Sequence, residues 1–488
     1  MSQKAVVISS LIWKFMERIG SQAASFIVAI ILARLLAPAD FGLIALVMVF
    51  IAVANVFVQS GLNTALVQKK NADNLDFSTV LYAGFVVAIV LYGLLFFTAP
   101  LLADFYNGQS KIIDVIRVLG ITLFFGALNS VQEAYIARNM MFKKLFYRSI
   151  GATIPSGLFG VVLAYVGFGV WALVGQQLMN AFLVSVIMWF TVKWRPSLAF
   201  SFTRFKGLFA FGWKLLVSSL LDTFYRNIRD LVIGKMFSPA DLGFYNRGDQ
   251  FPKIIITNIN SSIQSVLLPS LSTVQDDQER LKMLARRSIR MSAFLLLPMM
   301  TGLAAIAEPI TLLVLGEKWL PSVPFIRICC FSYAFWPIHT TNLSAINAVG
   351  RSDVFLKLEI VKKCYGFVVL AFFIWQFRSP IGIALSAAIT APLGSFVNAY
   401  PNKKLLNYGF IEQMKDFLPS FLLAVVVGIG VYVLSKVLIL SVIFQLPLLV
   451  AAGGIAYFLC AKILRFESLE YILGVVREYW AKKRRTKL

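Results

Sequence analysis

The stretch LARLLAPADFG at residues 32–42 returns near the middle of the chain as IGKMFSPADLG at residues 233–243. Both copies have a basic residue four positions before a Pro-Ala-Asp triplet and a glycine two positions after the aspartate. Upstream, Trp13-Lys14 matches Trp213-Lys214 at nearly the same offset. This agreement indicates a duplicated chain. In each copy we expect the proline to end one helix, the aspartate to cap the next, and the glycine to allow a close approach.

Composition decides the class of protein. The 488 residues are 59% hydrophobic and 14% charged, with a mean hydropathy of +0.79. Soluble domains are about 45–50% apolar and about 25% charged. A cytosolic enzyme, a secreted disulfide scaffold and a disordered chain are therefore disfavoured. The apolar segments are about 20 residues long, which suits helices that cross a bilayer and not the short strands of a barrel. We predict an all-α polytopic membrane protein.

Apolar windows bounded by charge, Pro and Gly predict about fourteen transmembrane helices. The spans at 208–236 and 241–270 are the most polar of them. The predicted spans are 9–35, 41–66, 77–101, 112–137, 145–166, 170–192, 208–236, 241–270, 283–307, 323–348, 354–376, 381–401, 418–440 and 444–464.

The repeat divides these spans into two six-helix repeats plus two extra C-terminal helices. Since six helices separate the two copies of the motif, the repeats share one orientation, as in transporters that bind substrate between parallel halves. We predict lobes at 1–206 and 207–404, helices 13 and 14 within 405–466, and a basic cytoplasmic tail at 467–488. A duplicated bundle without a transport role is the alternative.

Charge predicts the orientation. The chain has 46 Lys and Arg against 23 Asp and Glu, a net charge of +23. With the N-terminus in the cytoplasm, most of the bases fall on inner loops, so both termini are predicted to be cytoplasmic. One such group of inner bases is Arg138, Lys143, Lys144 and Arg148. This bias accounts for the charge without a nucleic-acid partner. No cleavable signal peptide is evident, and residues 465–480 are expected to form a short interfacial helix.

Residues that bind metals or undergo redox chemistry are few. The four cysteines lack CxxC spacing, and His339 is the single histidine. We therefore expect no metal site and no redox centre. A packed or interfacial His339 is the favoured interpretation.

Polar side chains recur inside the predicted spans, where charge is costly. Lys14 and Arg18 share a helix face, as do Asn55, Gln59 and Asn63, and Arg226 can be flanked by Asp222 and Asp230. These groups either hold helices together or line an aqueous cavity between the two halves. The cavity would be cationic and suited to a phosphate-bearing substrate. The candidate substrate-binding residues are Lys14, Arg18, Asn55, Gln59, Arg226, Arg229, Arg247 and Lys253.

Carboxylates inside the membrane are candidates for coupling transport to a proton or sodium gradient. We favour Glu133, because its own helix has no basic residue three or four positions away. A structural bond to another helix, such as to Arg18, is the alternative for Glu133, and His339 is a weaker candidate for coupling. The candidate coupling residues are Glu17, Glu133, Asp222, Asp230 and Asp249.

Residues 33–42, ARLLAPADFG, resemble the signature of Wzx-type polysaccharide transporters in the multidrug/oligosaccharidyl-lipid/polysaccharide (MOP) flippase superfamily. GFYNR at 243–247 and LPSLS at 268–272 are similar to the colanic-acid and teichuronic-acid exporter branch. The resemblance implies a non-enzymatic flippase without a cofactor that works by alternating access of two lobes. It would move an undecaprenyl-diphosphate-linked oligosaccharide repeat unit across the bacterial inner membrane for O-antigen, capsule or exopolysaccharide synthesis.

The resemblance leaves two alternatives. One is a peptidoglycan-precursor (lipid II) flippase or a small-molecule exporter of the same superfamily. The other is a membrane polysaccharide polymerase or ligase, which would need a sizeable outer loop that the predicted spans do not leave room for. The expected partners are the lipid-linked substrate, membrane lipid, and polysaccharide polymerase or assembly proteins, with the transporter itself a monomer.

Overall fold

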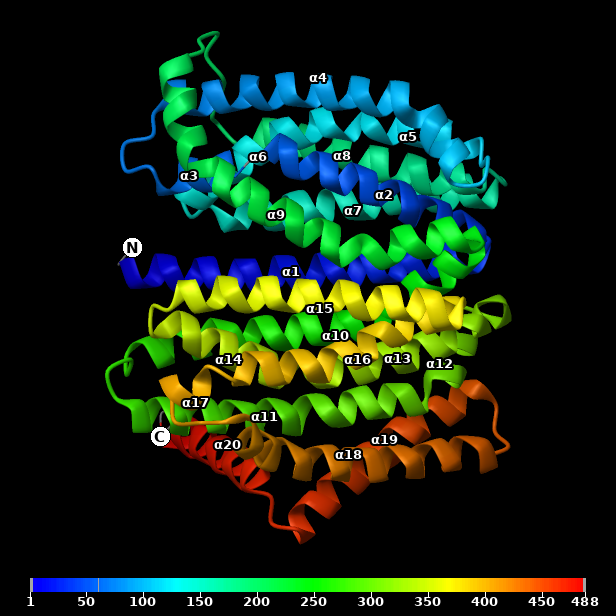
Figure 1. Cartoon of the computed structure of the whole chain (residues 1–488), viewed down its shortest axis with the longest axis vertical. Coiled ribbons are helices and arrows are strands. Elements are labelled where there is room, and N and C mark those ends of the chain that lie inside the picture. The colour runs from blue at the N-terminus through cyan, green and yellow to red at the C-terminus, as the bar shows by residue number, and fades with distance from the viewer. Residues whose placement is uncertain (1–2, 60, 486–488) are drawn as a thin grey trace. The chain divides into compact units, whose positions relative to one another are not determined.

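The computed structural model describes the backbone of residues 3–59 and 61–485. Side chains of residues 3–12, 14–15, 475–476 and 479–485 lie outside the described part. Within it, all regular secondary structure is helical, which confirms the predicted all-α class. The chain divides into two compact units, Met1–Gly243 and Phe244–Leu488, and Figure 1 shows long helices running alongside one another within each. The predicted lobe boundaries, which follow the sequence repeat, stay a prediction.

The first unit contains nine helices and the start of a tenth among the described residues. In it α7 packs between α1 and α8, while α2 packs against α6 and α9, and α4 against α5 and α6. Its elements are α1 (Gln3–Leu35), α2 (Pro38–Gln59), α3 (Leu62–Gln68), α4 (Asn74–Phe105), α5 (Lys111–Gly120), α6 (Thr122–Arg138), α7 (Phe142–Tyr165), α8 (Val170–Thr191), α9 (Phe202–Met236) and the start of α10 (Pro239–Ser272).

The second unit holds the rest of α10 and the helices that follow. Here α11 packs against α13 and α18, α16 packs against α13, α14 and α15, and α19 packs against α18. Its elements are α11 (Gln278–Ala305), α12 (Ala307–Val314), η1 (Glu317–Ser322), α13 (Val323–Ala334), α14 (Trp336–Ala348), α15 (Ser352–Phe377), α16 (Pro380–Ala399), α17 (Asn402–Leu405), α18 (Phe410–Val437), α19 (Val442–Ile463) and α20 (Glu467–Arg485).

Eleven helical stretches among the described residues are long and apolar enough to cross a membrane. The predicted spans at 145–166, 323–348 and 354–376 are helical but are not among these eleven, so the count of fourteen stays a prediction. Large apolar side chains lie on the outer surface of the long helices: Phe97 of α4, for example, is 79% exposed. A surface of this kind suits hydrocarbon and not water. The chain is a multi-pass membrane protein.

Three predicted spans are each broken into two helices. The span at 41–66 becomes α2 and α3, the span at 112–137 becomes α5 and α6, and the span at 323–348 becomes α13 and α14. At the first break Gly61 has a φ of 64°, a left-handed conformation that favours glycine. A Cβ on Gly61 would lie 2.5 Å from the backbone oxygen of Gly212, so glycine also permits α9 to approach. At the third break Pro337 lies at the start of α14, where a proline is tolerated.

The two copies of the repeated motif form matching helix junctions. In the first, α1 ends at Leu35 and α2 begins at Pro38; in the second, α9 ends at Met236 and α10 begins at Pro239. The Asp40 carboxylate accepts the Ala37 backbone N–H at 3.2 Å, and Asp241 accepts that of Ser238 at 3.1 Å. Each aspartate lies in the first turn of its helix. It caps that helix, as the sequence predicts, by accepting the backbone N–H of the residue just before the helix.

The expected interfacial helix at 465–480 is helical as α20, but part of its apolar face is covered by protein. Leu469 is buried, and Ile472 and Leu473 pack against the main apolar cluster of the second unit. On α11, Arg290 forms an ion pair with Glu467, and the Arg287 guanidinium lies 3.4 Å from the centroid of the Tyr471 ring. These contacts fix the start of α20 to the bundle.

Candidate functional site

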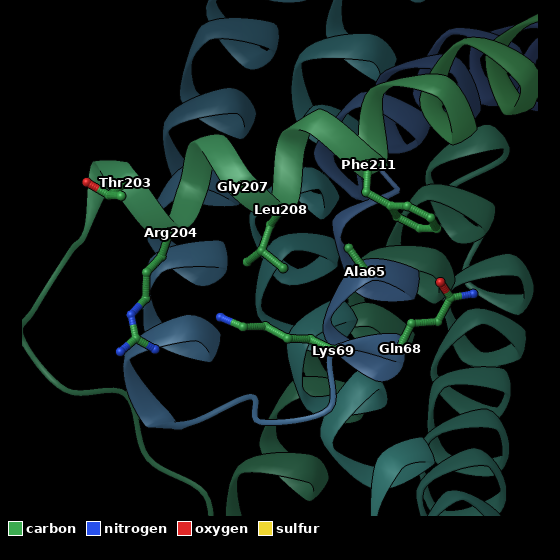
Figure 2. Close-up of a pocket in the computed structure, with 8 residues that line it drawn as sticks. All are labelled: Ala65, Gln68, Lys69, Thr203, Arg204, Gly207, Leu208 and Phe211. Atoms are coloured by element: carbon green, nitrogen blue, oxygen red, sulfur yellow. The ribbon is translucent and has the colours of Figure 1, made fainter.

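A cavity of about 500 Å³ lies in the first unit, between α3 and the first turns of α9 (Figure 2). Figure 2 shows Lys69 and Arg204 extending toward each other from the two sides of this cavity. Its lining residues are Ala65, Gln68, Lys69, Thr203, Arg204, Gly207, Leu208 and Phe211.

Both bases of this cavity are held by carboxylates at the start of α4. Lys69 Nζ lies 2.6 Å from Asp76, and Arg204 Nη1 lies 2.6 Å from Asp73 and 3.2 Å from Asp76. Asp76 is fully buried, and together with Asp73 it forms a reciprocal capping box at the start of α4. The Asp76 backbone N–H, and after it the Arg204 guanidinium, lowers the pKa of Asp73 below its usual value of 3.8. We call these four residues the α4–α9 clamp.

Arg138, at the end of α6, binds the chain at the end of α3, next to Lys69 of the clamp. Its guanidinium donates hydrogen bonds to the backbone oxygens of Leu66 at 3.2 Å and Lys70 at 2.6 Å, and also to that of Lys69. These carbonyls lie in the last turn of α3 and just after it, where helix oxygens lack partners within the helix. A cation at the end of α3 therefore orders the turn that presents Lys69 to Asp76.

Two of the four acidic candidates in the first unit, Glu17 and Glu133, meet neighbouring residues of α7. The Ser149 hydroxyl donates to the Glu17 carboxylate at 2.7 Å, and Arg148 forms an ion pair with Glu133. The premise that Glu133 is unpaired is therefore wrong. Its partner Arg148 comes from another helix, as the alternative anticipated, where the sequence suggested Arg18. The charge pattern places Arg148 among the inner-loop bases, whereas α7 begins at Phe142 and includes it.

The charges of α9 pair along the helix, as their spacing predicts. Arg226 Nε lies 2.7 Å from the Asp222 carboxylate, with the two side chains 75% and 42% exposed. Arg229 and Asp230, one turn further along, are half-buried. The Arg226 pair is open enough for an anionic ligand to compete with Asp222 for the guanidinium.

In the second unit, the charges of α10 divide into two groups. Asp249 accepts a hydrogen bond from the Tyr333 hydroxyl at 2.7 Å and lies 3.1 Å from Lys253 Nζ. Arg247 donates to the Gln250 side chain, and its guanidinium lies 5.8 Å from the centroid of Trp319. Tyr333, which no charge pattern marks in the sequence, thus joins α13 to the polar face of α10.

The remaining candidates lie apart from these groups. Asn55 is half-buried on α2 and faces α6, because a Cβ on Gly126 would lie 2.7 Å from its Oδ1. Gln59 and Arg18 are exposed, and the side chain of Lys14 lies outside the described residues. His339 is packed: its Nδ1 lies 2.9 Å from Asn398 Nδ2 and its Nε2 lies 3.0 Å from the Ala391 oxygen.

An apolar groove of about 470 Å³, which the sequence did not reveal, lies in the second unit between α11, α12, α18 and α19. Glycines leave room along it: a Cβ on Gly302 or on Gly454 would meet no atom within 4 Å. No charged side chain lines it. Its lining residues are Ile255, Pro298, Met299, Thr301, Gly302, Leu303, Ile306, Ile310, Val427, Gly428, Val431, Leu449, Val450, Gly453, Gly454 and Tyr457.

Comparisons with known proteins agree with these features. A family profile described as polysaccharide biosynthesis protein matches residues 31–324. The succinoglycan biosynthesis transport protein ExoT of Rhizobium meliloti is 25% identical, with 72% of this chain and 71% of that protein covered. The teichuronic acid biosynthesis protein TuaB of Bacillus subtilis is 24% identical, with 84% and 86% covered. The lipopolysaccharide biosynthesis protein WzxC of Escherichia coli is 23% identical, with 82% and 81% covered.

Two solved structures share the fold. The lipid II flippase MurJ, in an inward closed conformation, has a TM-score of 0.76 at 13% identity, with 93% of this chain and 98% of that chain covered. An inward-facing MATE family transporter of the MOP superfamily has a TM-score of 0.61 at 15% identity, with 79% and 95% covered. The chain therefore shares the all-α fold of these two transporters.

Proposed function

Since this chain belongs to the polysaccharide biosynthesis protein family, we propose that it is a flippase for an undecaprenyl-diphosphate-linked oligosaccharide repeat unit. It would carry the sugar headgroup from the cytoplasmic to the outer leaflet of the bacterial inner membrane, and both of its termini would be cytoplasmic. The substrate class is supported by the names of the relatives, which concern the synthesis or transport of surface polysaccharides.

The observation that carries this proposal is the apolar groove of the second unit. A diphosphate with several sugars cannot cross about 30 Å of hydrocarbon unaided. Its prenyl tail, in contrast, is stable in lipid and needs only an apolar path along the protein. The groove offers about 470 Å³ without a charged side chain in its lining, which suits a hydrocarbon chain. A small water-soluble substrate would gain nothing from such a groove.

The headgroup would bind to the polar faces of α1, α2, α9 and α10. Arg226 and Arg247 are the first candidates for the diphosphate, because a guanidinium offers a planar fork to phosphate oxygens. Arg226 is exposed and forms an ion pair with the Asp222 carboxylate. A phosphate oxygen of the substrate could replace that carboxylate as the negatively charged partner of the guanidinium. Lys14, Arg18, Arg229 and Lys253 would add positive charge, with Asn55 and Gln59 as hydrogen-bonding groups.

Alternating access would open and close the ends of the helices that carry the repeated motif. In the proposed orientation the motif lies at the outer ends of α1, α2, α9 and α10. The contact between its two copies would then have to separate for the substrate to leave. Coupling to a proton or sodium gradient would use one of the carboxylates Glu17, Glu133, Asp222, Asp230 and Asp249. Glu133 would have to release Arg148 to do so, as Asp222 would have to release Arg226 and Asp249 would have to release Lys253.

Deletion of the gene tests this function. A flippase predicts lipid-linked repeat units that accumulate on the cytoplasmic side and surface polysaccharide that returns on complementation. Unpolymerised units outside the membrane would instead indicate a polymerase or ligase acting after translocation. Loss of cell-wall integrity on deletion, with surface polysaccharide unchanged, would indicate a lipid II flippase. The monomeric state and a partnership with polymerase or assembly proteins belong to the same proposal and are tested by co-purification.

A further inference from the structure

A second cavity, of about 230 Å³, lies in the second unit where α19 ends and α20 begins. We call this region the α19–α20 elbow. Three basic residues line it: Arg290 from α11, Lys415 from α18, and Arg465 from the turn itself. The whole lining is Arg290, Lys415, Asp416, Pro419, Ser420, Leu464, Arg465, Phe466, Glu467 and Ser468.

The two acidic residues of the elbow, Asp416 and Glu467, are both in ion pairs. Asp416 is buried between Arg286, at 2.8 Å, and Arg290, at 2.6 Å, and it also accepts the Tyr408 hydroxyl at 2.8 Å. Glu467 pairs with Arg290. These bonds leave Lys415 and Arg465, both exposed, without a carboxylate partner in the described part of the chain. The elbow therefore has two cations directed at one cavity and available to an anion.

The backbone of the elbow is held in an unusual conformation that positions one of these cations. Arg465 has a φ of 52°, in the left-handed region that residues other than glycine rarely adopt. The turn closes where the Phe466 N–H donates to the Ala461 oxygen at 3.0 Å. It leaves Ile463 77% exposed and Leu464 62% exposed, directly beside Arg465.

This arrangement lies at the end of a membrane span. The segment Val442–Ile463 is apolar enough to cross the bilayer, and α20 follows it at once. Basic side chains beside exposed aliphatic ones, at the level where hydrocarbon meets water, match the two parts of a lipid molecule. A soluble phosphate compound would use the cations and leave the aliphatic side chains in water.

We propose that the α19–α20 elbow binds an anionic phospholipid of the membrane. Its phosphate lies between Lys415 and Arg465, and its acyl chains lie against Ile463 and Leu464. The site is separate from the apolar groove and from the substrate proposed above. It anchors the junction between the last membrane span and the basic tail at the leaflet surface.

The test uses the purified full-length protein in detergent. Phosphatidylglycerol and phosphatidylcholine are titrated separately, and bound lipid is counted by native mass spectrometry. A charge near the membrane surface contributes roughly fivefold to affinity, so the K415Q/R465Q double variant should bind phosphatidylglycerol about 25-fold more weakly. The K403Q/K404Q variant removes two exposed cations outside the cavity and should bind like the unmodified protein. The charge-retaining K415R/R465K variant should keep most of the binding.

Three results would overturn the site. One is equal binding of the two lipids, and another is equal loss in the elbow variant and its matched control. The third is displacement of phosphatidylglycerol by inorganic phosphate at equal concentration, which would show a site for soluble anions. Because none of these measurements involves transport, failure of the lipid site and failure of the flippase function are distinguishable.

Discussion

Gly42 and Gly243, which occupy the same position in the two copies of the repeated motif, lie against one another's helix starts. A Cβ on Gly42 would lie 1.7 Å from the backbone oxygen of Pro239, and a Cβ on Gly243 would lie 2.1 Å from that of Pro38. The contact is therefore reciprocal, as a two-fold relation between the copies requires. It consists of backbone against backbone, so no side chain can relax to make room.

Gly42→Ala should destabilise the protein, because its methyl group would have to force the two helix starts apart. Overpacking of this kind costs about 1–3 kcal/mol. The matched control is Gly93→Ala in α4, where a Cβ meets no atom within 4 Å and alanine is the better helix former. Thermal unfolding should show a lower midpoint for the first variant alone. Equal midpoints would contradict the reciprocal contact.

Asp76→Asn should weaken the α4–α9 clamp while keeping the shape of the side chain. The substitution leaves Lys69 and Arg204 without their buried carboxylate, and a hydrogen bond to a charged group contributes about 1.5–3 kcal/mol. Asp353→Asn is the control: it breaks the Arg351 pair, in which both side chains are about half exposed, and it should lower stability much less than Asp76→Asn does. Similar losses of stability in the two variants would show that Asp76 stabilises the protein no more than a surface residue does.

The clamp should also show a definite pH dependence. The pKa of Asp73 is lowered from 3.8 in the folded protein, so its contribution to stability is present above that pH and is lost as the pH falls through the lowered value. The difference in unfolding midpoint between the unmodified protein and the Asp73→Asn variant should be constant from about pH 5 to about pH 8 and shrink at lower pH. A difference that grows on acidification would mean that the sign of the shift is wrong.

Filling the apolar groove should stop transport without unfolding the protein. Gly454→Leu places a large side chain where no atom lies within 4 Å of the added Cβ, so it should occupy the space proposed for the prenyl tail. Gly93→Leu makes the same change at an open position on α4, outside the groove lining. Export of surface polysaccharide should fall at least tenfold in the first variant only, at equal membrane levels of the two proteins. Normal export with the groove filled would remove it from the substrate path.

Replacement of Glu133 should resemble replacement of its partner. If the Glu133 carboxylate only pairs with Arg148, the Glu133→Gln and Arg148→Gln variants should lower the transport rate to a similar extent, and both should keep their dependence on the proton or sodium gradient. Transport measured with and without the gradient distinguishes the roles. Loss of gradient dependence in the Glu133 variant alone would make Glu133 the coupling group after all.

The class of the protein and much of its helix pattern could be predicted from the sequence, because bilayer thickness dictates the length of apolar segments. The motif predicted the Asp40 and Asp241 caps because capping depends only on residues that are close in the sequence. Local reasoning failed where partners come from distant segments. Glu133 has no base on its own helix and yet pairs with Arg148 of α7, and Asp76 meets Arg204 from 128 positions further along the chain.

The breaks within spans were hidden for a different reason. Hydropathy averages over a window, so it continues through Gly61, where the left-handed backbone interrupts the helix, and through Ile121, where α5 ends and α6 begins. The apolar groove was hidden because apolar residues that line a space have the same composition as those that fill one.

Reconstitution into liposomes measures flippase activity itself. Purified protein is inserted into vesicles that contain an undecaprenyl-diphosphate-linked oligosaccharide, and an added glycosidase reports the fraction of sugar exposed on the outer leaflet. This fraction should rise above the starting distribution with the unmodified protein and stay near it with an R226A/R247A variant that inserts equally well. Equal exposure in vesicles with and without the protein would contradict the assignment of this chain as the flippase.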